Sequence, residues 1–332
     1  MLKVAINGFG RIGRHSLKVA WDRDDMEIVA INDLTDNKTL AHLLKHDTAY
    51  PDWGHEISFD EEHLIIDGKK IKAYSERDPV QLPWKELEVD VVMESTGIFR
   101  TSEKAGLHLQ AGAKKVVLSA PGKGDDIETY VRGINCGSYS GAKIIDNASC
   151  TTNCTAPVVQ ALHKKFGVEK ALLNTIHSYT SDQNLQDAPH SDLRRARAAA
   201  QNMIPTSTGA AKATTKVIPD LAGKFDGMAI RVPTLTVSLV DFALVLGKNV
   251  TVEEVNECLR EASETYLKGI LAVTDEPLVS SDFIGNPYSS TADLSFTKVA
   301  GGNLVKVISW YDNEWGYANR LVEMVEIVGK HE

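Results

Sequence analysis

Residues 4–13 read VAINGFGRIG, and this stretch decides the fold of the N-terminal half of the chain. A short apolar run leads into three glycines spaced G-x-G-x-x-G, and an amphipathic segment at 11–22 follows. A second apolar run at 28–31 leads to Asp33, 20 residues after Gly13. A strand, a glycine-rich turn, a helix and then an acidic residue are typical of a dinucleotide-binding βαβ unit.

Each part of this pattern has a physical role. Gly8, Gly10 and Gly13 allow the backbone to approach a pyrophosphate, which binds at the positive end of the helix. The carboxylate of Asp33 can then reach a hydroxyl of the adenosine ribose. The alternative is a plain strand-turn-helix joint with an Asp in the next turn. The flanking strands and helix favour dinucleotide binding.

The same alternation continues along the first 150 residues. Apolar runs at 89–93, 116–118 and 144–145 predict buried strands, and the segments 38–45 and 102–111 predict helices between them. This order predicts an α/β fold with a doubly wound parallel sheet. A hairpin is expected around Asp67-Gly68, between strands at 64–66 and 69–74.

The pattern changes after about residue 150. Longer strand-like runs at 171–178, 228–246 and 304–311 alternate with helical stretches, which predicts an α+β domain with a mainly antiparallel sheet. Thr251 and Glu254 form a capping-box pattern at the start of one helix. Apolar residues at helical spacing predict a closing helix at 318–328.

Composition excludes several classes of protein. The 332 residues are 43% hydrophobic and 24% charged, which excludes a disordered chain. A net charge of -9 argues against broad binding to nucleic acid or to an anionic membrane. The sequence has no apolar run of 18 residues, and its first strand-like run starts at Leu2, so we expect a cytoplasmic protein without a membrane span. Four irregularly spaced cysteines predict neither a disulfide framework nor a zinc site, and no metal is expected.

The candidate nucleophile is Cys150, in the sequence SCTTNC at 149–154. If Ser149 or its neighbour caps the helix that follows, Cys150 lies in its first turn, where the helix dipole favours a thiolate. The equal alternative is a small buried hydrophobe. Cys154 is expected to be structural, because cysteines four residues apart on a helix lie too far apart for a disulfide. His177, at the end of an apolar strand, is the candidate base, although a structural role is also open.

Two arginine-containing segments suggest anion binding. Residues 192–197 contain three arginines and precede the hydroxyl-rich run 206–209. Guanidinium groups, hydroxyls and free backbone N–H groups suit phosphate oxygens, whereas the alternative is a solvated basic helix face. Arg231 lies within an apolar strand and therefore needs a partner or a ligand.

Together these motifs resemble the phosphorylating glyceraldehyde-3-phosphate dehydrogenase family, in its bacterial and plastid branch. The resemblance extends along essentially the whole chain and rests on residues 6–14, 147–154, 177–180, 192–200, 205–212 and 310–317. It implies a Rossmann-type NAD-binding domain at 1–149 and 313–332, and a catalytic domain at 150–312. It also implies a homotetramer in which residues 179–203 reach the cofactor of a neighbouring subunit.

The resemblance also implies roles for particular residues. Cys150 would form a thiohemiacetal and then a thioester with the substrate, glyceraldehyde 3-phosphate, and His177 would move the proton. Thr180 and Arg231 would bind the substrate phosphate. The attacking inorganic phosphate would be bound by Ser149, Thr151, Arg197, Thr208 and Gly209. The cofactor NAD would contact Arg11, Ile12, Asp33, Arg77, Thr96, Ser119, Asn313 and Tyr317, in addition to the three glycines.

Two other functions stay open on the sequence. An erythrose-4-phosphate dehydrogenase would keep the cysteine and the histidine but tends to lose Tyr179-Thr180 and the run 208–212, which this chain keeps. A non-catalytic NAD-binding thiol sensor would be expected to have lost Cys150 or His177, and both are present.

Overall fold

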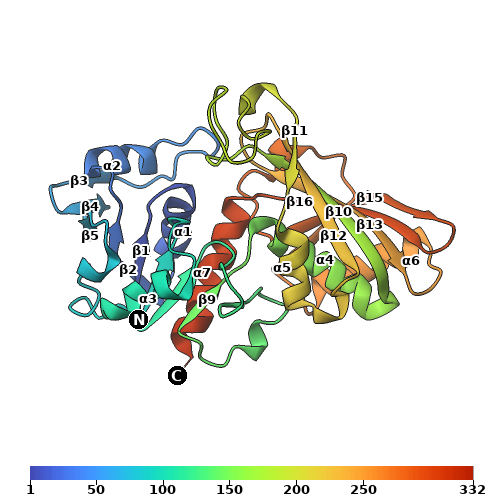
Figure 1. Ribbon diagram of the computed structural model, residues 1–332, viewed down its shortest axis with the longest axis horizontal. Coiled ribbons are helices and arrows are strands. Elements are labelled where there is room, and N and C mark those ends of the chain that lie inside the picture. Colours follow the sequence, from blue (N-terminus) through green and yellow to red (C-terminus); the bar gives the residue numbers. More distant parts are fainter. Residues whose placement is uncertain (332) are drawn as a thin grey trace. The chain divides into compact units, whose positions relative to one another are not determined.

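The computed structural model describes residues 1–331, which form two compact units (Figure 1). Unit 1 comprises Met1–Tyr130, Cys136–Ala148 and the chain from Ala318 onward. Unit 2 comprises Val131–Asn135 and Ser149–Tyr317. These bounds follow from which parts of the chain pack against one another. The division into an NAD-binding domain at 1–149 and 313–332 and a catalytic domain at 150–312 is a statement about function and stays a prediction.

Unit 1 contains a nine-stranded sheet in the order β3-β4-β5-β2-β1-β6-β7-β9-β8. The strands β5, β2, β1, β6, β7 and β9 are parallel to one another, which confirms the predicted doubly wound sheet. The strand order reverses at β1, because β2 pairs with one side of it and β6 with the other. A ligand of such a sheet binds at the carboxyl ends of the strands beside this reversal. The strands are β1 (Leu2–Asn7), β2 (Met26–Asn32), β3 (Ile57–Phe59), β4 (His63–Ile66), β5 (Lys69–Tyr74), β6 (Val91–Glu94), β7 (Lys115–Leu118), β8 (Glu128–Thr129) and β9 (Ile144–Asp146).

Helices and a tight turn complete unit 1. The helices are α1 (Arg11–Trp21), α2 (Asn37–Lys45) and α3 (Ser102–Gln110), close to the predicted bounds. The predicted hairpin is confirmed, since β4 and β5 pair antiparallel across Asp67 and Gly68. Both turn residues have positive φ, 47° and 79°, as this two-residue turn requires.

Unit 2 contains a seven-stranded sheet in the order β11-β12-β10-β13-β16-β15-β14. Most neighbours are antiparallel, as predicted, while β10 with β12 and β14 with β15 are parallel. The predicted run 228–246 is two strands, because the chain turns between residues 233 and 237 after Pro233, which cannot donate a ladder hydrogen bond. The strands are β10 (Val168–Ser178), β11 (Ile204–Ser207), β12 (Phe225–Val232), β13 (Ser238–Leu246), β14 (Leu271–Thr274), β15 (Ser290–Ala300) and β16 (Leu304–Tyr311).

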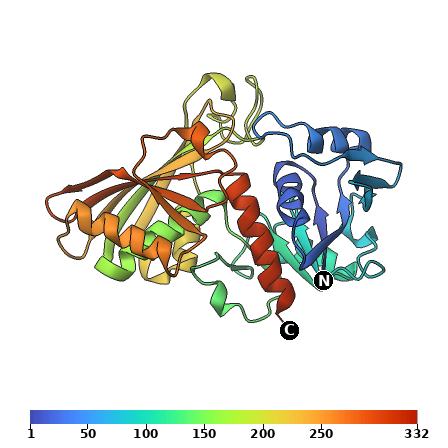
Figure 2. The ribbon, with the colours of Figure 1, turned by 180° about the vertical axis from the view of Figure 1, so that it is seen from behind.

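The helices of unit 2 cover one face of this sheet. They are α4 (Cys150–Phe166), α5 (Ala210–Val217) and α6 (Val252–Glu264). Figure 2 shows α6 lying across β14 and β15. The predicted capping box is confirmed, since the Thr251 hydroxyl accepts from the Glu254 N–H while the Glu254 carboxylate accepts from the Thr251 N–H.

The last helix, α7 (Trp315–Lys330), begins three residues before the predicted start. The carboxylate of Asp312 accounts for the earlier start, because it accepts hydrogen bonds from the N–H groups of Glu314 (2.9 Å) and Trp315 (2.8 Å). None of the helices within residues 1–331 is long and apolar enough to cross a membrane.

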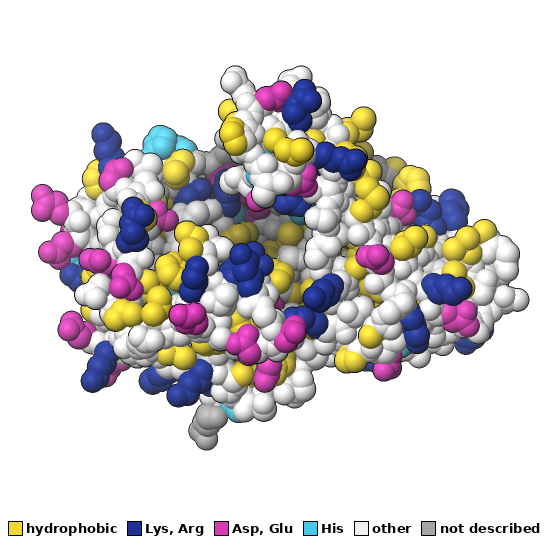
Figure 3. All heavy atoms as spheres, viewed as in Figure 1, with side chains coloured by type: hydrophobic (Ala, Val, Ile, Leu, Met, Phe, Trp, Pro, Cys, Tyr) yellow, Lys and Arg dark blue, Asp and Glu magenta, His cyan; other side chains and the backbone are white. Residues whose placement is uncertain are grey.

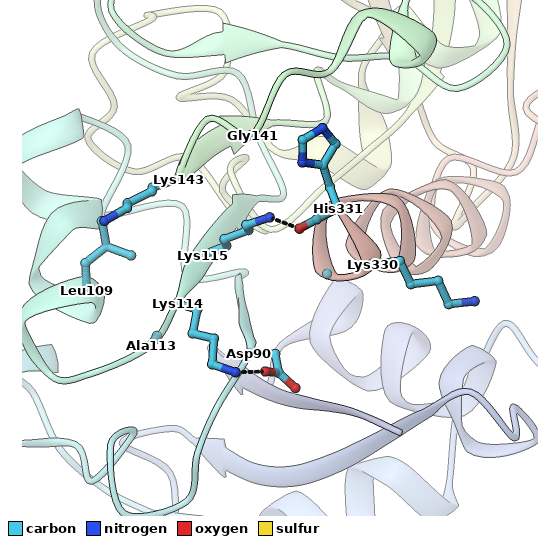
Figure 4. A pocket seen from close by; sticks show the side chains of 10 residues that line it. Asp90, Leu109, Ala113, Lys114, Lys115, Gly141, Lys143, Lys330 and His331 are labelled. Atoms are coloured by element: carbon cyan, nitrogen blue, oxygen red, sulfur yellow. Dashed lines mark hydrogen bonds and ion pairs between the residues drawn. The ribbon is translucent and has the colours of Figure 1, made fainter.

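Unit 1 has a cavity that lies away from the predicted cofactor loop. On the face drawn in Figure 3, acidic and basic side chains are interspersed. A cavity of about 580 Å³ lies at the amino ends of β7 and β9 (Figure 4). Lys115, at the edge of the cavity, donates to the carbonyl oxygens of Val328 (2.9 Å) and His331 (2.6 Å). Its amine therefore caps the C-terminal end of α7. The cofactor loop is at the opposite, carboxyl ends of the strands.

Candidate active site

Cys150 is the first residue of α4, as the sequence predicts. Ser149 is the N-cap, and its hydroxyl accepts a hydrogen bond from the N–H of Thr152 at 3.1 Å. The thiol therefore lies at the positive end of a 17-residue helix. Cys150 as a whole residue is half-buried.

His177 lies beside this thiol at the end of β10. Its Nε2 is 3.5 Å from the Cys150 Sγ, and its ring is 4% exposed. Its Nδ1 is 2.7 Å from the carbonyl oxygen of Ser178. The Nη1 of Arg231 also lies 3.1 Å from this Nδ1, but it donates to the same Ser178 carbonyl oxygen. Because a carbonyl oxygen only accepts, the shorter contact to Ser178 places the proton on Nδ1, and Nε2 presents its lone pair to the sulfur. The structure thus brings the two predicted catalytic residues together in the geometry of a thiol and its base.

Arg231 lies next to His177 because β10 and β12 run parallel with these two residues in register. Its Nη1 donates to the carbonyl oxygen of Ser178 at 3.1 Å and to the Thr180 hydroxyl at 3.4 Å. Its Nε is buried and has no hydrogen-bond partner in the described chain. Within residues 1–331 no carboxylate lies at ion-pair distance from it, so its positive charge is available to an anion.

The protonation of the pair follows from burial. Burial raises the pKa of the Cys150 thiol, and the positive charge of Arg231 acts against this rise. Burial, followed by the charge of Arg231, lowers the pKa of His177 to about 3. Without a bound substrate, the raised pKa of Cys150 and the lowered pKa of His177 both favour a neutral thiol beside a neutral imidazole. This differs from the prediction that the helix dipole favours a thiolate at Cys150, because burial disfavours the charged form of the thiol. The imidazole is therefore neutral, with Nε2 free of a proton beside the thiol.

Tyr311 supports this pair and was not predicted as a site residue. Its hydroxyl lies 2.9 Å from the hydroxyls of both Thr151 and Thr175, and burial raises its pKa well above the usual value. Its ring meets the His177 ring edge-on, with centroids 6.0 Å apart. The predicted phosphate ligand Thr151 thus also anchors the first turn of α4 to β16.

Asn313 is held by two serines beside the end of β10. Its Oδ1 accepts from the hydroxyls of Ser178 (2.9 Å) and Ser238 (3.0 Å), which directs its NH₂ group away from them. Tyr317, in the first turn of α7, is buried.

The structure separates the three arginines of residues 192–197. The guanidinium of Arg195 donates to the Thr206 hydroxyl (2.9 Å) and to the Ser207 carbonyl oxygen (3.1 Å), directly before Thr208 and Gly209. It also forms an ion pair with Asp182 at 2.5 Å. Its charge also lowers the pKa values of His177 and Arg231. Arg197, the predicted phosphate ligand, instead forms an exposed ion pair with Asp187 at 2.8 Å. Arg195 is therefore the arginine that lies near the site.

The glycine loop after β1 fits a dinucleotide. Gly8 has φ of 91°, and a Cβ atom there would lie 2.6 Å from the backbone nitrogen of Thr96. A Cβ on Gly13 would lie 2.2 Å from the Gly8 carbonyl oxygen. Only glycine satisfies both positions, and α1 begins at Arg11 with its first N–H groups beside the loop.

Asp33 follows β2 at the same edge. Its carboxylate accepts from the N–H groups of Phe9 (2.8 Å) and Thr35 (3.0 Å), which holds it beside the glycine loop. Arg11 forms an ion pair with Asp47 at 2.5 Å. Ser119 follows β7, and its N–H donates to the Glu94 carbonyl oxygen at 2.9 Å. Ile12 lies in α1 and Arg77 follows β5.

Cys154 is structural, as predicted. It is buried, its Sγ lies 3.4 Å from the Ser290 hydroxyl, and burial raises its pKa to about 12. All four cysteines of the described chain are free, and in residues 1–331 no cluster of three His, Cys, Asp or Glu side chains could hold a metal ion.

Known proteins similar to this chain agree with the architecture of both units. A family model described as "Glyceraldehyde 3-phosphate dehydrogenase, NAD binding domain" matches residues 2–102, and one described as the C-terminal domain of the same enzyme matches residues 149–313. Glyceraldehyde-3-phosphate dehydrogenase of Thermotoga maritima is 56% identical over 99% of this chain and 100% of its own length. Glyceraldehyde-3-phosphate dehydrogenase 1 of Bacillus cereus is 55% identical over 98% of this chain and 97% of its own. A chloroplastic enzyme of Arabidopsis thaliana is 54% identical over 99% of this chain and 84% of its own.

These matches cover both units, and they include the loop around Gly8 and the segment that carries Cys150 and His177. The chain belongs to the glyceraldehyde-3-phosphate dehydrogenase family.

Proposed function

We propose that this protein converts D-glyceraldehyde 3-phosphate and inorganic phosphate into 1,3-bisphosphoglycerate while reducing NAD, as a step of glycolysis and gluconeogenesis. The observation that carries the proposal is the 3.5 Å approach of the Cys150 Sγ to the Nε2 of His177, whose other nitrogen is held by Ser178. Membership of the family supports the same reaction.

The residues of unit 2 account for the acyl chemistry. The thiol of Cys150 gives its proton to His177 Nε2 as the sulfur attacks the aldehyde carbon, and His177 returns the proton to the new oxygen, forming a thiohemiacetal. His177 then removes the hydroxyl proton, and two electrons leave the carbon as a hydride, which forms a thioester. The chemistry that bound NAD supplies is acceptance of this hydride. A phosphate oxygen then attacks the thioester, and the carbon–sulfur bond breaks to release the acyl phosphate.

Two groups of residues are proposed to bind phosphate. Arg231 and Thr180 would bind the phosphate of the substrate, because no carboxylate among residues 1–331 pairs with Arg231 and its Nη1 lies 3.4 Å from the Thr180 hydroxyl. The attacking phosphate would be bound by Ser149, Thr151, Thr208 and Gly209. We assign the accompanying arginine as Arg195 in place of Arg197, since Arg195 contacts β11 immediately before Thr208.

The two arginines provide a matched pair of variants. Arg195→Ala is expected to raise the KM for inorganic phosphate roughly 10- to 150-fold, because a charge-assisted hydrogen bond to phosphate is lost. Arg197→Ala removes an exposed ion pair and is expected to change this KM by less than about twofold. Steady-state kinetics with phosphate as the varied substrate measure both. A larger effect from Arg197→Ala would restore the assignment made from the sequence.

Unit 1 is proposed to bind NAD through Gly8, Gly10, Gly13 and Asp33, with further contacts from Arg11, Ile12, Arg77, Thr96 and Ser119. Asn313 and Tyr317 are proposed to contact the nicotinamide. The Asp33 carboxylate would repel the 2′-phosphate of NADP by about 4 kcal/mol for each pair of unit charges about 4 Å apart at an effective dielectric near 20. Screening leaves a preference for NAD of about 5- to 30-fold in kcat/KM.

An NADH-forming assay tests the function. The purified protein is supplied with glyceraldehyde 3-phosphate or erythrose 4-phosphate, with NAD or NADP, and with or without inorganic phosphate. The proposal expects the highest kcat/KM with glyceraldehyde 3-phosphate, NAD and phosphate together. A preference for erythrose 4-phosphate would identify the sister enzyme, and NAD binding without turnover would identify a thiol sensor.

We also propose a cytoplasmic homotetramer, on the basis of family membership. The outer face of the sheet in unit 2 supports association, since Leu172, Met228 and Leu304 are 62%, 42% and 47% exposed there. Light scattering on the purified protein counts the subunits, and a monomer at micromolar concentration would contradict the proposal.

A further inference from the structure

A buried carboxylate lies directly beneath the glycine loop of unit 1 and takes no part in the proposed chemistry. Glu94 is the last residue of β6 and is 2% exposed. Its Oε2 accepts from the Asn7 side-chain amide at 2.6 Å and from the Nε2 of His108 at 3.0 Å. Its Oε1 accepts from the backbone N–H of Thr96 at 2.8 Å and from the Thr96 hydroxyl. Four donors thus converge on one side chain that water does not reach.

The proton position on His108 follows from its second partner. The indole N–H of Trp84 donates to His108 Nδ1 at 3.0 Å. An indole nitrogen only donates, so Nδ1 must carry a lone pair and Nε2 must carry the proton that faces Glu94. A doubly protonated ring would place two N–H groups head to head at Trp84. The imidazole therefore donates from Nε2 to Glu94, and both carboxyl oxygens of Glu94 have hydrogen-bond donors.

The partners of Glu94 belong to the loops that surround the predicted cofactor site. Asn7 ends β1 and directly precedes Gly8, whose missing Cβ would lie 2.6 Å from the Thr96 nitrogen. The Asn7 amide oxygen accepts from the Asn32 amide at 2.7 Å, at the end of β2. The network therefore connects the carboxyl ends of β1, β2 and β6, on both sides of the point where the strand order reverses.

Burying the carboxyl group of Glu94 costs free energy, and its hydrogen bonds must offset this cost. Apolar residues of similar volume would fill the space without the desolvation cost of a buried carboxylate. A fully satisfied polar network, in contrast, restricts its members to one arrangement. Here that arrangement holds Asn7, which directly precedes Gly8, and the turn at Thr96, because both donate to Glu94.

We propose that Glu94 is a positioning residue for dinucleotide binding, and that the His108–Trp84 pair fixes its carboxylate by holding one tautomer of the imidazole. The carboxylate holds the glycine loop and the Thr96 turn in the arrangement that receives the cofactor. This inference rests on the proposed NAD binding by unit 1.

Glu94→Gln tests the proposal with almost no change in volume. An amide has one accepting and one donating end, so its NH₂ group must face either the Asn7 and His108 donors or the Thr96 donors. We expect the dissociation constant for NAD, measured by titration calorimetry, to rise about 10- to 100-fold. Trp84→Phe removes the N–H that fixes the tautomer and should raise the same constant about 3- to 10-fold. The rate at which iodoacetamide labels Cys150 without cofactor should stay within about twofold of wild type, because Cys150 belongs to unit 2.

Asp293→Asn is the matched control. Asp293 is 1% exposed, lies in unit 2, and accepts from the Trp310 indole N–H at 3.2 Å and from the Ser295 hydroxyl at 2.6 Å. This variant should lower the thermal midpoint while it leaves NAD affinity within about twofold. A folded Glu94→Gln protein with wild-type NAD affinity would overturn the proposal, and if that variant does not fold, wild-type affinity in Trp84→Phe would overturn it. Absence of NAD binding by the wild-type protein would instead refute the proposed function.

Discussion

Cys150→Ser is expected to lower the dehydrogenase rate by about 10³- to 10⁶-fold, the loss typical of removing a catalytic nucleophile. A serine hydroxyl ionises far less readily than a thiol, so the same imidazole removes its proton far less easily. Stopped-flow measurement of NADH formation gives the rate. Titration calorimetry should find unchanged NAD affinity, because the glycine loop and Asp33 belong to unit 1.

Alkylation separates this role from a general effect on folding. Iodoacetamide should label Cys150 before the other thiols, since Cys154 and Cys258 are buried and their pKa values are raised to about 12 and 11. Cys136 is half-buried and is the competing site, so Cys136→Ser is the matched control. That variant should keep wild-type turnover. Substantial turnover in Cys150→Ser, or inactivation that follows labelling of Cys136, would contradict the proposed thioester.

The local parts of this site could be predicted because each depends on neighbours in sequence. The glycine spacing requires a close backbone approach, and the contacts of Gly8 and Gly13 show why no side chain fits. Ser149 can cap a helix only if the helix begins at the next residue, which places Cys150 in its first turn. The setting of His177 at the end of an apolar strand made it a candidate base, but a structural role stayed open until the resemblance was considered. Its approach to Cys150 depends on the packing of α4 on the sheet, because 27 residues separate the two.

The parts that could not be predicted depend on long-range packing. Tyr311 reaches Thr151 across 160 residues, and a buried tyrosine at the end of a strand has no sequence signal of its own. The choice between Arg195 and Arg197 depends on which guanidinium contacts β11. The sequence alone does not show which of two arginines, two residues apart, makes this contact. The sign of the pKa shift at Cys150 also required the structure, since the helix N-terminus and the surrounding protein act in opposite directions.

His177→Asn is expected to lower the rate about 10²- to 10⁴-fold, the usual contribution of a positioned general base. The amide keeps a polar side chain at the end of β10, but it cannot take the proton of a thiol 3.5 Å from the present Nε2. His163→Asn is the matched control, because His163 accepts from the Val168 N–H at 2.9 Å and lies at the far end of α4 from Cys150. That control is expected to keep more than half of wild-type turnover.

The pH dependence distinguishes a lost base from a distorted site. Without the imidazole, attack requires a thiolate formed by solvent, and burial raises the pKa of the Cys150 thiol. The rate of the His177→Asn variant should therefore climb about tenfold for each pH unit from neutral pH until that pKa is reached. The wild-type rate should change less over this range, because neutral imidazole is already present above a pKa of about 3. Parallel pH profiles for the two proteins would mean that His177 positions the thiol without accepting its proton.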